Sequence, residues 1–194
     1  MLGCSDEPMA PAAGDDVASK TIDGPAGQPT ARVNITFTEL NSGNVFDDFT
    51  ITNASDPGFR ILAVHLYFQS SPTDVIIDML PGAPGVGQGS WMYTLDEWQC
   101  GLKEWRGLLE GGKRIVLKWW FFTPGKSFRF GVDMDRQYLA EGRWEEEVTG
   151  ADMAGSTMTI ELVAPNGVQM MMTKQLERLD VLQAGMTVEM PLPL

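Results

Sequence analysis

Tryptophan and positive charge are concentrated in one stretch of this sequence, a combination suited to binding. Five of the six tryptophans fall within residues 91–120, and residues 103–129 hold seven of the 14 basic residues. Tryptophan and arginine are enriched where proteins bind partners. The stretch therefore predicts a partner-binding surface. The residues expected on this surface are Trp91, Trp98, Trp105, Arg106, Lys113, Arg114, Trp119 and Trp120.

Residue types that catalysis needs are sparse. A Ser/His/Asp system would have to use His65, the only histidine, and no nucleophile motif stands near it. The glycine-rich stretch 82–89 lacks the GxxxxGKS or GxxxxGKT spacing that holds phosphate. Acidic residues 145–147, with Asp152, could bring carboxylates together for hydrolysis, although a run of charge is usually a solvated face. The sequence predicts no catalysis and no cofactor, with a carboxylate hydrolase as an alternative.

Metal ligands are also few. One histidine and two cysteines are too few for a zinc site. Calcium accepts hard oxygen ligands on loops, and Asp133 and Asp135 stand at the end of an expected strand. A complete calcium site takes about 6 to 8 oxygens, and no loop shows such a series. No metal site is therefore expected, and Asp133 and Asp135 are kept only as weak calcium candidates.

Charge and hydropathy exclude two classes of partner. The 194-residue chain carries 26 acidic and 14 basic residues, a formal charge of −12. A nucleic-acid backbone needs a basic protein face, so this charge argues against nucleic acid as the main partner. No apolar run approaches the roughly 20 residues that a membrane-spanning helix needs. The length suits one main hydrophobic core with attachments.

Residues 1–30 are expected to form a flexible acidic arm. They are rich in Pro, Ala and Gly and show no apolar periodicity that would anchor them to a core. Five acidic residues stand against one lysine, so the arm carries −4 of the total charge, and like charges keep it extended. The acidic residues are Asp6, Glu7, Asp15, Asp16 and Asp23, and the lysine is Lys20.

The opening Met1-Leu2-Gly3-Cys4, followed by Ser5-Asp6-Glu7, resembles the cleavage end of a bacterial lipoprotein signal. The resemblance implies a lipid on Cys4 and an extracytoplasmic, membrane-anchored protein in the periplasm or at the cell surface. Only three residues precede Cys4, whereas a complete signal has a basic start and an apolar region. Two alternatives stay open: a start codon placed too late, or a chance motif in a protein with two reduced cysteines, Cys4 and Cys100.

From residue 31 the sequence predicts an antiparallel β-sandwich that extends to residue 190, with 191–194 as a tail. Eight or nine short stretches alternate apolar and polar residues, with turn residues between them and no crossover helices. That pattern is typical of all-β sandwiches. The residues expected inside are Phe37, Phe49, Ile51, Val64, Leu66, Phe128, Phe130, Val132, Ile160 and Leu162.

One amphipathic helix is predicted within residues 94–110, as part of a tryptophan-rich insertion at about 80–114. Apolar residues recur there at spacings of three and four, Thr94 and Glu97 suit a capping box, and two glycines follow. For about half of the tryptophans the alternative to surface binding is expected, in which Trp98 and Trp105 pack this helix onto the sandwich and Trp119 or Trp120 enters the core. Cys100 falls on the opposite, exposed side of the helix.

The segments FDDFTITNASD, FTPGKSFRFGVDMD and VTGADMAGSTMTIELVAPNG resemble a β-sandwich module of secreted and surface-anchored bacterial proteins. The resemblance covers about half of the chain, within residues 46–167 and outside 70–114. Such modules bind, connect or display, and rarely catalyse. The resemblance therefore implies a sandwich fold and an extracytoplasmic location.

Together these observations predict a non-catalytic, extracytoplasmic accessory or structural subunit. It would dock on a larger membrane-bound complex, with a photosynthetic or respiratory assembly as the expected kind. The acidic arm and the tryptophan-rich stretch are its two predicted docking surfaces. A carbohydrate-binding module of the cell envelope is the alternative, and it would need two or more tryptophans in a flat exposed row. An envelope hydrolase is the second alternative.

Overall fold

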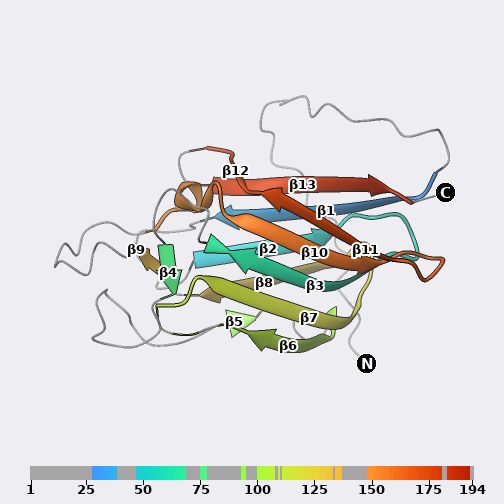
Figure 1. The fold of residues 1–194 in the computed structure, drawn as a ribbon, viewed down its shortest axis with the longest axis horizontal. Coiled ribbons are helices and arrows are strands. Elements are labelled where there is room, and N and C mark those ends of the chain that lie inside the picture. The colour runs from blue at the N-terminus through green and yellow to red at the C-terminus, as the bar shows by residue number, and fades with distance from the viewer. Residues whose placement is uncertain are drawn as a thin grey trace.

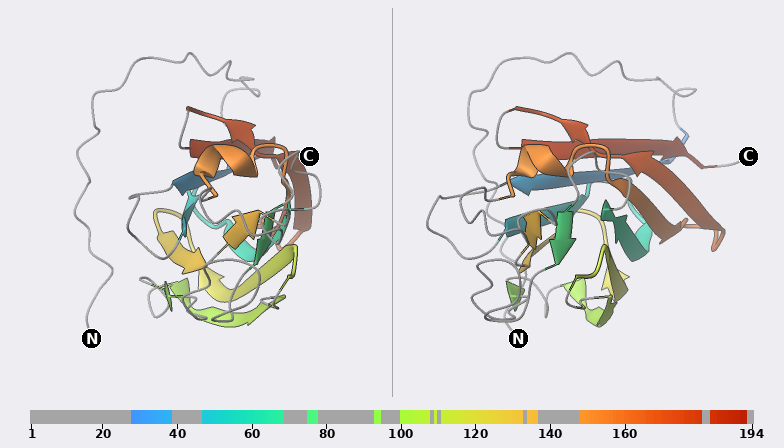
Figure 2. Two further views of the ribbon diagram at one scale, coloured as in Figure 1. Left: turned by 90° about the vertical axis from the view of Figure 1, so that its left-hand side faces the viewer. Right: turned by 60° about the vertical axis from the view of Figure 1, so that its left-hand side comes forward.

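The protein is an all-β sandwich of two antiparallel sheets packed face to face (Figures 1 and 2). The fold class predicted from the sequence is thereby confirmed. The computed structural model describes residues 28–38, 47–68, 75–77, 93–94, 100–107, 109, 111–132, 134–136, 148–180 and 183–192.

The first sheet has six strands in the order β12-β13-β1-β2-β8-β5. The long pairs β13–β1 and β1–β2 place Phe37 opposite Ala184 and Phe49. The strands of this sheet are β1 (Thr30–Thr38), β2 (Asp47–Asn53), β5 (Tyr93–Thr94), β8 (Ser127–Val132), β12 (Glu177–Arg178) and β13 (Gln183–Pro191).

The second sheet has five strands in the order β11-β10-β3-β7-β6 and lies toward the viewer in Figure 1. Its strands are β3 (Arg60–Tyr67), β6 (Leu102–Arg106), β7 (Arg114–Phe122), β10 (Thr157–Val163) and β11 (Gln169–Gln175). A two-stranded sheet, β4 (Val75–Ile77) with β9 (Met134–Arg136), and a short 3-10 helix, η3 (Gly150–Met153), lie beside the sandwich.

Phenylalanine rings fill the space between the two sheets. All ten residues predicted inside the sandwich are buried, which confirms that the alternation was interpreted correctly. Phe49 stacks on Phe130 with ring centroids 4.7 Å apart, and Phe37 lies 4.3 Å from Phe49. From the second sheet, Trp119 packs edge-on against Phe128 at 5.3 Å. Ring-to-ring contacts therefore join the two layers.

The predicted helix over residues 94–110 is wrong at Thr94, which lies in β5, and over Leu102–Arg106, which is strand β6, paired with β7; Cys100 between them is helical. Gly101 and Gly107 flank the strand with φ of +65° and +87°, values that a right-handed helix excludes. A bulge between Leu102 and Glu104 explains the error. The extra residue places Leu102 and Trp105, three apart, on the same side of a strand, which imitates helical spacing.

The prediction that Cys100 is exposed or covered by a partner is also wrong. Its side chain is fully buried, and Sγ lies 3.3 Å from the Ser127 carbonyl oxygen. Cys100 itself has α-helical backbone, so the error lies in the side of the helix to which it was assigned. Residues 95–99 of the expected helix lie outside the described part of the chain.

Replacing Gly107 by alanine distinguishes strand from helix by the sign of its effect. In a helix interior the change would stabilise the protein by about 1 kcal/mol. In the structure it destabilises the protein, because φ is +87° and the new Cβ would lie 2.4 Å from the Arg114 carbonyl oxygen. Gly125→Ala is the matched control, since φ is +80° there and no atom lies within 4 Å of the new Cβ.

Chemical denaturation measures both variants. Gly125→Ala should cost about 1 to 2 kcal/mol from its backbone conformation, and Gly107→Ala clearly more. A Gly107→Ala protein as stable as the parent would contradict the β6–β7 hairpin.

Core truncation tests the packing of the sandwich. Leu66→Ala or Phe130→Ala should lower the free energy of unfolding by about 2 to 5 kcal/mol, because each removes buried surface and leaves a cavity. Gln175→Ala, on the exposed end of β11, should change it by no more than about 0.5 kcal/mol. Urea unfolding gives these values, and losses below about 0.5 kcal/mol at Leu66 and Phe130 would show that the buried faces are wrongly assigned.

Candidate functional site

Two adjacent aromatic side chains near the end of strand β7, Trp120 and Phe121, are exposed to solvent. Ile61 of β3 pairs with Phe122, whereas Ala63 pairs with Lys118, so three residues of β7 stand opposite one residue of β3. Such a bulge bends a strand and redirects its side chains. As a result Trp120 is 60% exposed and Phe121 is 46% exposed, while Trp119 before them is 3% exposed.

A lysine lies over each exposed ring. Lys103 Nζ is 4.0 Å from the centroid of the Trp120 ring, and Lys126 Nζ is 5.5 Å from that of Phe121. Gly101 lies against the Phe121 ring, since a Cβ at this glycine would be 2.5 Å from it. The backbone N–H of Trp120 also donates to the backbone carbonyl of Gly101, with N and O 2.8 Å apart. We call these five residues the aromatic cluster.

Asn53 of β2 fixes the turn that carries Lys126. Its buried side-chain Nδ2 donates to the Phe122 carbonyl at 2.9 Å, and its backbone N–H donates to the Lys126 carbonyl at 3.0 Å. The Gly125 N–H in turn donates to the Asn53 carbonyl at 2.8 Å. The β7–β8 turn is therefore tied to the first sheet, and the cluster rests on a rigid base.

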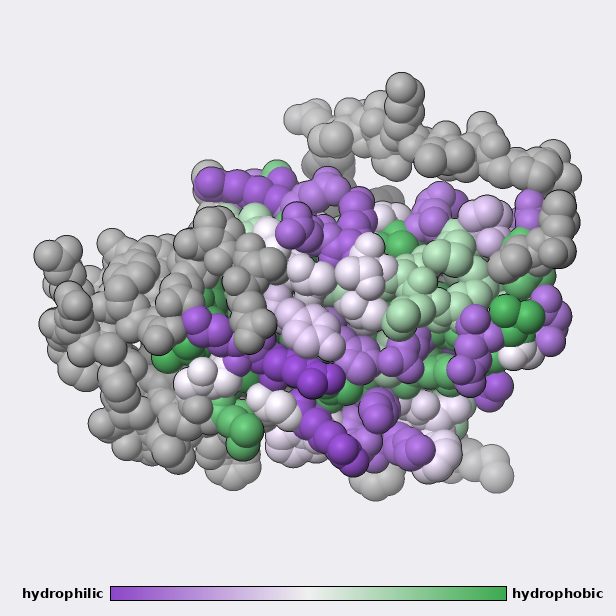
Figure 3. All heavy atoms as spheres, viewed as in Figure 1, coloured by the Kyte–Doolittle hydropathy of each residue, from purple (hydrophilic) through white to green (hydrophobic). Residues whose placement is uncertain are grey.

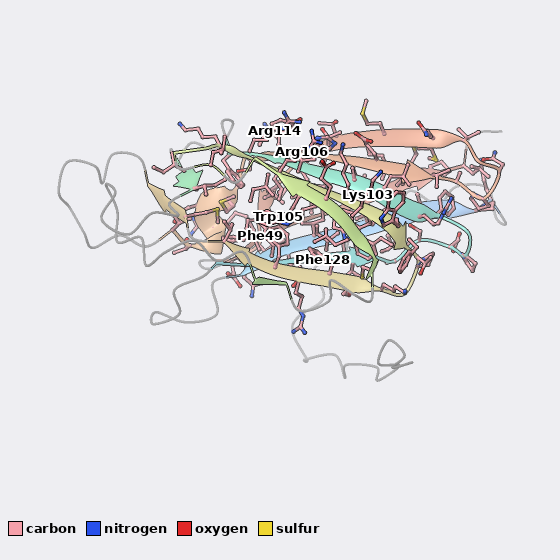
Figure 4. All side chains as sticks on the ribbon, turned by 90° about the horizontal axis from the view of Figure 1, so that it is seen from below. Phe49, Lys103, Trp105, Arg106, Arg114 and Phe128 are labelled. Carbon is pink, nitrogen blue, oxygen red and sulfur yellow. The ribbon has the colours of Figure 1, made fainter. Side chains whose placement is uncertain are left out.

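Basic side chains continue from this cluster along the outer face of β6 and β7. The register places Arg106 beside Val116 and Glu104 beside Lys118, and Arg114 lies four residues before Lys118 on the same face of β7. We call Lys103, Arg106, Arg114 and Lys118 the basic strip. Figure 4 shows Arg106 and Arg114 on the outer side of this sheet, and Figure 3 shows hydrophilic side chains crossing the middle of the face.

One carboxylate partly neutralises the strip. Glu104 Oε2 lies 3.6 Å from Lys118 Nζ, and Arg106 forms an ion pair with Glu104 Oε1. Desolvation raises the pKa of Glu104, but the hydrogen bond and charge of Arg106, with those of Lys118, outweigh it and hold the pKa below its usual value. Glu104 is therefore ionised near neutral pH. Within the described residues, Lys103 and Arg114 pair with no carboxylate.

His65 lies on the same outer face, next to Arg114, as its alternation in the sequence predicts. Its Nε2 is 2.8 Å from Glu161 Oε1, and its Nδ1 is 3.4 Å from Arg114 Nη2. An arginine only donates, so Nδ1 accepts and Nε2–H donates to Glu161. The Arg114 guanidinium also lies 5.2 Å from the centre of the Tyr67 ring. His65 therefore links three strands, β10, β3 and β7.

Several residues predicted for the binding surface lie elsewhere. Trp119 is in the core between Phe122 and Phe128, so its assignment to the surface is wrong. Trp105 is 47% exposed but pairs with Leu117 on the inner side of the sheet, toward Phe49 and Phe128 in Figure 4. Arg106, Arg114 and Trp120 do lie on the outer face, and Lys113 stands in the turn before β7.

Other predicted sites fall outside the described residues. These are Cys4, Trp91, Trp98 and Asp133, and of Asp135 only the backbone, in β9, is described. Within the described part of the chain, no group of three or more His, Cys, Asp or Glu residues is placed to hold a metal ion. The same residues include no helix long and apolar enough to cross a membrane.

Sequence reasoning missed five members of the site: Gly101, Lys103, Lys118, Phe121 and Lys126. The alternation of β7 held part of the signal, since residues 114, 116, 118 and 120 share one face of a regular strand up to the bulge. Comparisons with family models, characterised proteins and solved structures find no match to this chain.

Proposed function

We propose that the protein is a non-catalytic subunit that docks on a larger assembly through the aromatic cluster and the basic strip. The observation that carries this proposal is the pair Trp120 and Phe121, adjacent, exposed and each beneath a lysine. Soluble proteins rarely keep large apolar rings together at the surface without a binding role. Trp and Arg are also the residues that interfaces favour.

The two parts of this surface would contribute differently to binding. A tryptophan ring buried at the centre of an interface acts as an anchor and mainly slows dissociation. Exposed cations at a rim mainly raise the association rate and make it sensitive to salt. Trp120 is therefore the expected anchor, and Arg106 and Arg114 the expected steering charges. The partner face should be apolar at its centre and acidic around it.

Carbohydrate binding receives less support. Stacking on sugars would need two or more tryptophans in one flat exposed row. Of the described tryptophans, the two exposed ones, Trp105 and Trp120, are on opposite sides of the second sheet, because Trp105 shares the inner side with Leu117. The second exposed ring beside Trp120 is Phe121, which lacks a hydrogen-bonding group. This arrangement favours a protein partner.

Hydrolysis also receives less support. His65 bonds to Glu161 and Arg114, and the hydroxyl within reach of its Nδ1 is the Tyr67 phenol at 3.5 Å, which belongs to no nucleophile motif. Asp152, the described member of the acidic group considered for hydrolysis, accepts hydrogen bonds from the Thr149 N–H and hydroxyl at 2.8 and 2.9 Å. These bonds cap η3, so the carboxylate has a structural role.

The location follows as part of the same proposal. A lipid on Cys4 would hold the protein on an envelope membrane, with residues 5–27 as the tether to β1, and the partner would be a membrane-bound assembly. Intact-mass measurement of the native protein tests this directly. We expect a chain that begins at Cys4 and carries a diacylglyceryl group, whereas an unmodified chain that retains Met1 would contradict the anchor.

Replacing the expected anchor tests the docking surface. Trp120→Ala should weaken association with the partner by about 2 kcal/mol or more, roughly thirtyfold, because it removes the large exposed ring of the aromatic cluster. The partner is first isolated by co-purification from solubilised native membranes, and its affinity for each variant is then measured with purified components. Leu179→Ala, which removes an exposed apolar side chain beside β12, is the matched control and should bind like the parent.

The proposal fails if Trp120→Ala binds the partner as tightly as the parent does. It also fails if the parent co-purifies with no protein under conditions that keep native complexes intact.

A further inference from the structure

Charge is divided unevenly between the described residues and the others. The described residues contain 12 of the 14 basic residues and 10 of the 26 acidic residues, which leaves them with a charge of +2. The remaining residues contain the other 2 basic and 16 acidic residues, a charge of −14. Of the acidic charge outside the described residues, residues 1–27 at the N-terminus carry −4.

Residues 1–27 join the sandwich at the end that carries the aromatic cluster. Thr30, which begins β1, exchanges hydrogen bonds with Asp56: its N–H donates to Oδ2 at 2.7 Å, and its carbonyl accepts from the Asp56 N–H at 3.0 Å. Asn53, three residues before Asp56, donates hydrogen bonds to the carbonyls of Phe122 and Lys126. In Figure 1 the start of β1 and the tip of β7 lie at the same, right-hand end.

The segment is long enough to follow the strip. From Trp120 to Arg114 the outer face of β7 runs six residues, about 20 Å at 3.3 Å per residue. A chain of 27 residues spans up to about 90 Å when extended and about 30 Å as a flexible coil. Asp23 is five residues before Gln28, the first described residue, and Asp16 and Asp15 are twelve and thirteen residues before it. The carboxylates can therefore reach different points along the roughly 20 Å length of the strip.

The chemistry of the segment matches both parts of the surface. Its carboxylates complement Lys103 and Arg114, which pair with no carboxylate among the described residues. Its prolines, Pro8, Pro11 and Pro25, favour extended conformations of the kind that dock on aromatic side chains. Because the segment belongs to the same chain, its effective concentration at the strip is in the millimolar range, so weak contacts suffice.

We propose that the acidic segment 1–27 docks in cis on the basic strip and the aromatic cluster of its own sandwich. The docking surface is then covered by the chain's N-terminal segment until a partner with a stronger apolar centre displaces it. This inference rests on the proposed docking surface, and it adds that the N-terminal segment regulates access of the partner to that surface. The arm and the tryptophan-rich stretch become two halves of one contact instead of two separate docking surfaces.

A spin label on the arm tests the contact in the full-length, unlipidated chain. The label is placed at Ala18→Cys with Cys4→Ser, since Cys100 is fully buried. We expect selective loss of NMR signal intensity at the amides of Lys103, Arg106 and Lys118 at low salt. The loss should disappear at 1 M salt, where the screening length falls to about 3 Å.

Matched variants assign the contact to these charges. Neutralising the arm, with Asn at Asp6, Asp15, Asp16 and Asp23 and Gln at Glu7, should abolish the signal loss, as should Lys103→Gln with Arg106→Gln. Lys174→Gln with Arg178→Gln, which removes two exposed cations of β11 and β12, should leave it unchanged. The arm-neutralised protein should also bind the partner several-fold more tightly than the parent.

Three results would overturn the inference. Signal loss that is absent or spread over the whole surface at low salt means that the strip is open to an external acidic partner. Loss that appears only between a labelled chain and a second, isotope-labelled chain means contact in trans between copies. Loss that persists in the arm-neutralised protein means that charge does not direct the contact. The Trp120→Ala result is independent of all three, so failure of this inference is distinguishable from failure of the proposed function.

Discussion

The packing of phenylalanine rings between the two sheets is the constraint on which the rest of the structure depends. Phe49 stacks on Phe130 at 4.7 Å, and Trp119 meets Phe128 from the other layer. Because side chains alternate along a strand, a one-residue slip would turn every ring of that strand toward solvent. Burial of these rings therefore fixes the register of β2, β7 and β8 and determines which side chains face outward.

The surface proposed for docking is a consequence of that register. Trp119 and Phe122 both face the core, although they are three residues apart in β7. A regular strand places residues three apart on opposite faces, so the chain between them must bulge. The bulge brings Trp120 and Phe121 outward together, while the regular part of β7 aligns Arg114 and Lys118 on the same outer face. Burial of Trp119 and Phe122 in the core thus requires the bulge that exposes Trp120 and Phe121.

Most of the sandwich could be predicted from alternation, because alternation reports local burial. The strands around Phe37, Ile51, Phe130 and Ile160 were found in this way. The bulges could not be predicted, since they depend on which strand lies alongside: the bulge in β6 imitates a helix, and the bulge in β7 separates Trp119 from Trp120. The pairing of His65 with Glu161, 96 residues apart, and of Lys118 with Glu104 likewise depends on strand order. The sequence predicts a binding surface in the tryptophan-rich stretch, but it does not distinguish the side chains that face the core from those that face outward.

Side-chain oxidation footprinting of the protein, free at 1 M salt, where the N-terminal segment is released, and in its native assembly, tests the central claim most directly. Met171 is 66% exposed on β11, away from the aromatic cluster, and gives an internal reference for access to solvent. The account predicts that oxidation of Trp120 and Phe121 falls sharply in the assembly while that of Met171 is unchanged. Protection of Met171 with undiminished oxidation of Trp120 and Phe121 would contradict it.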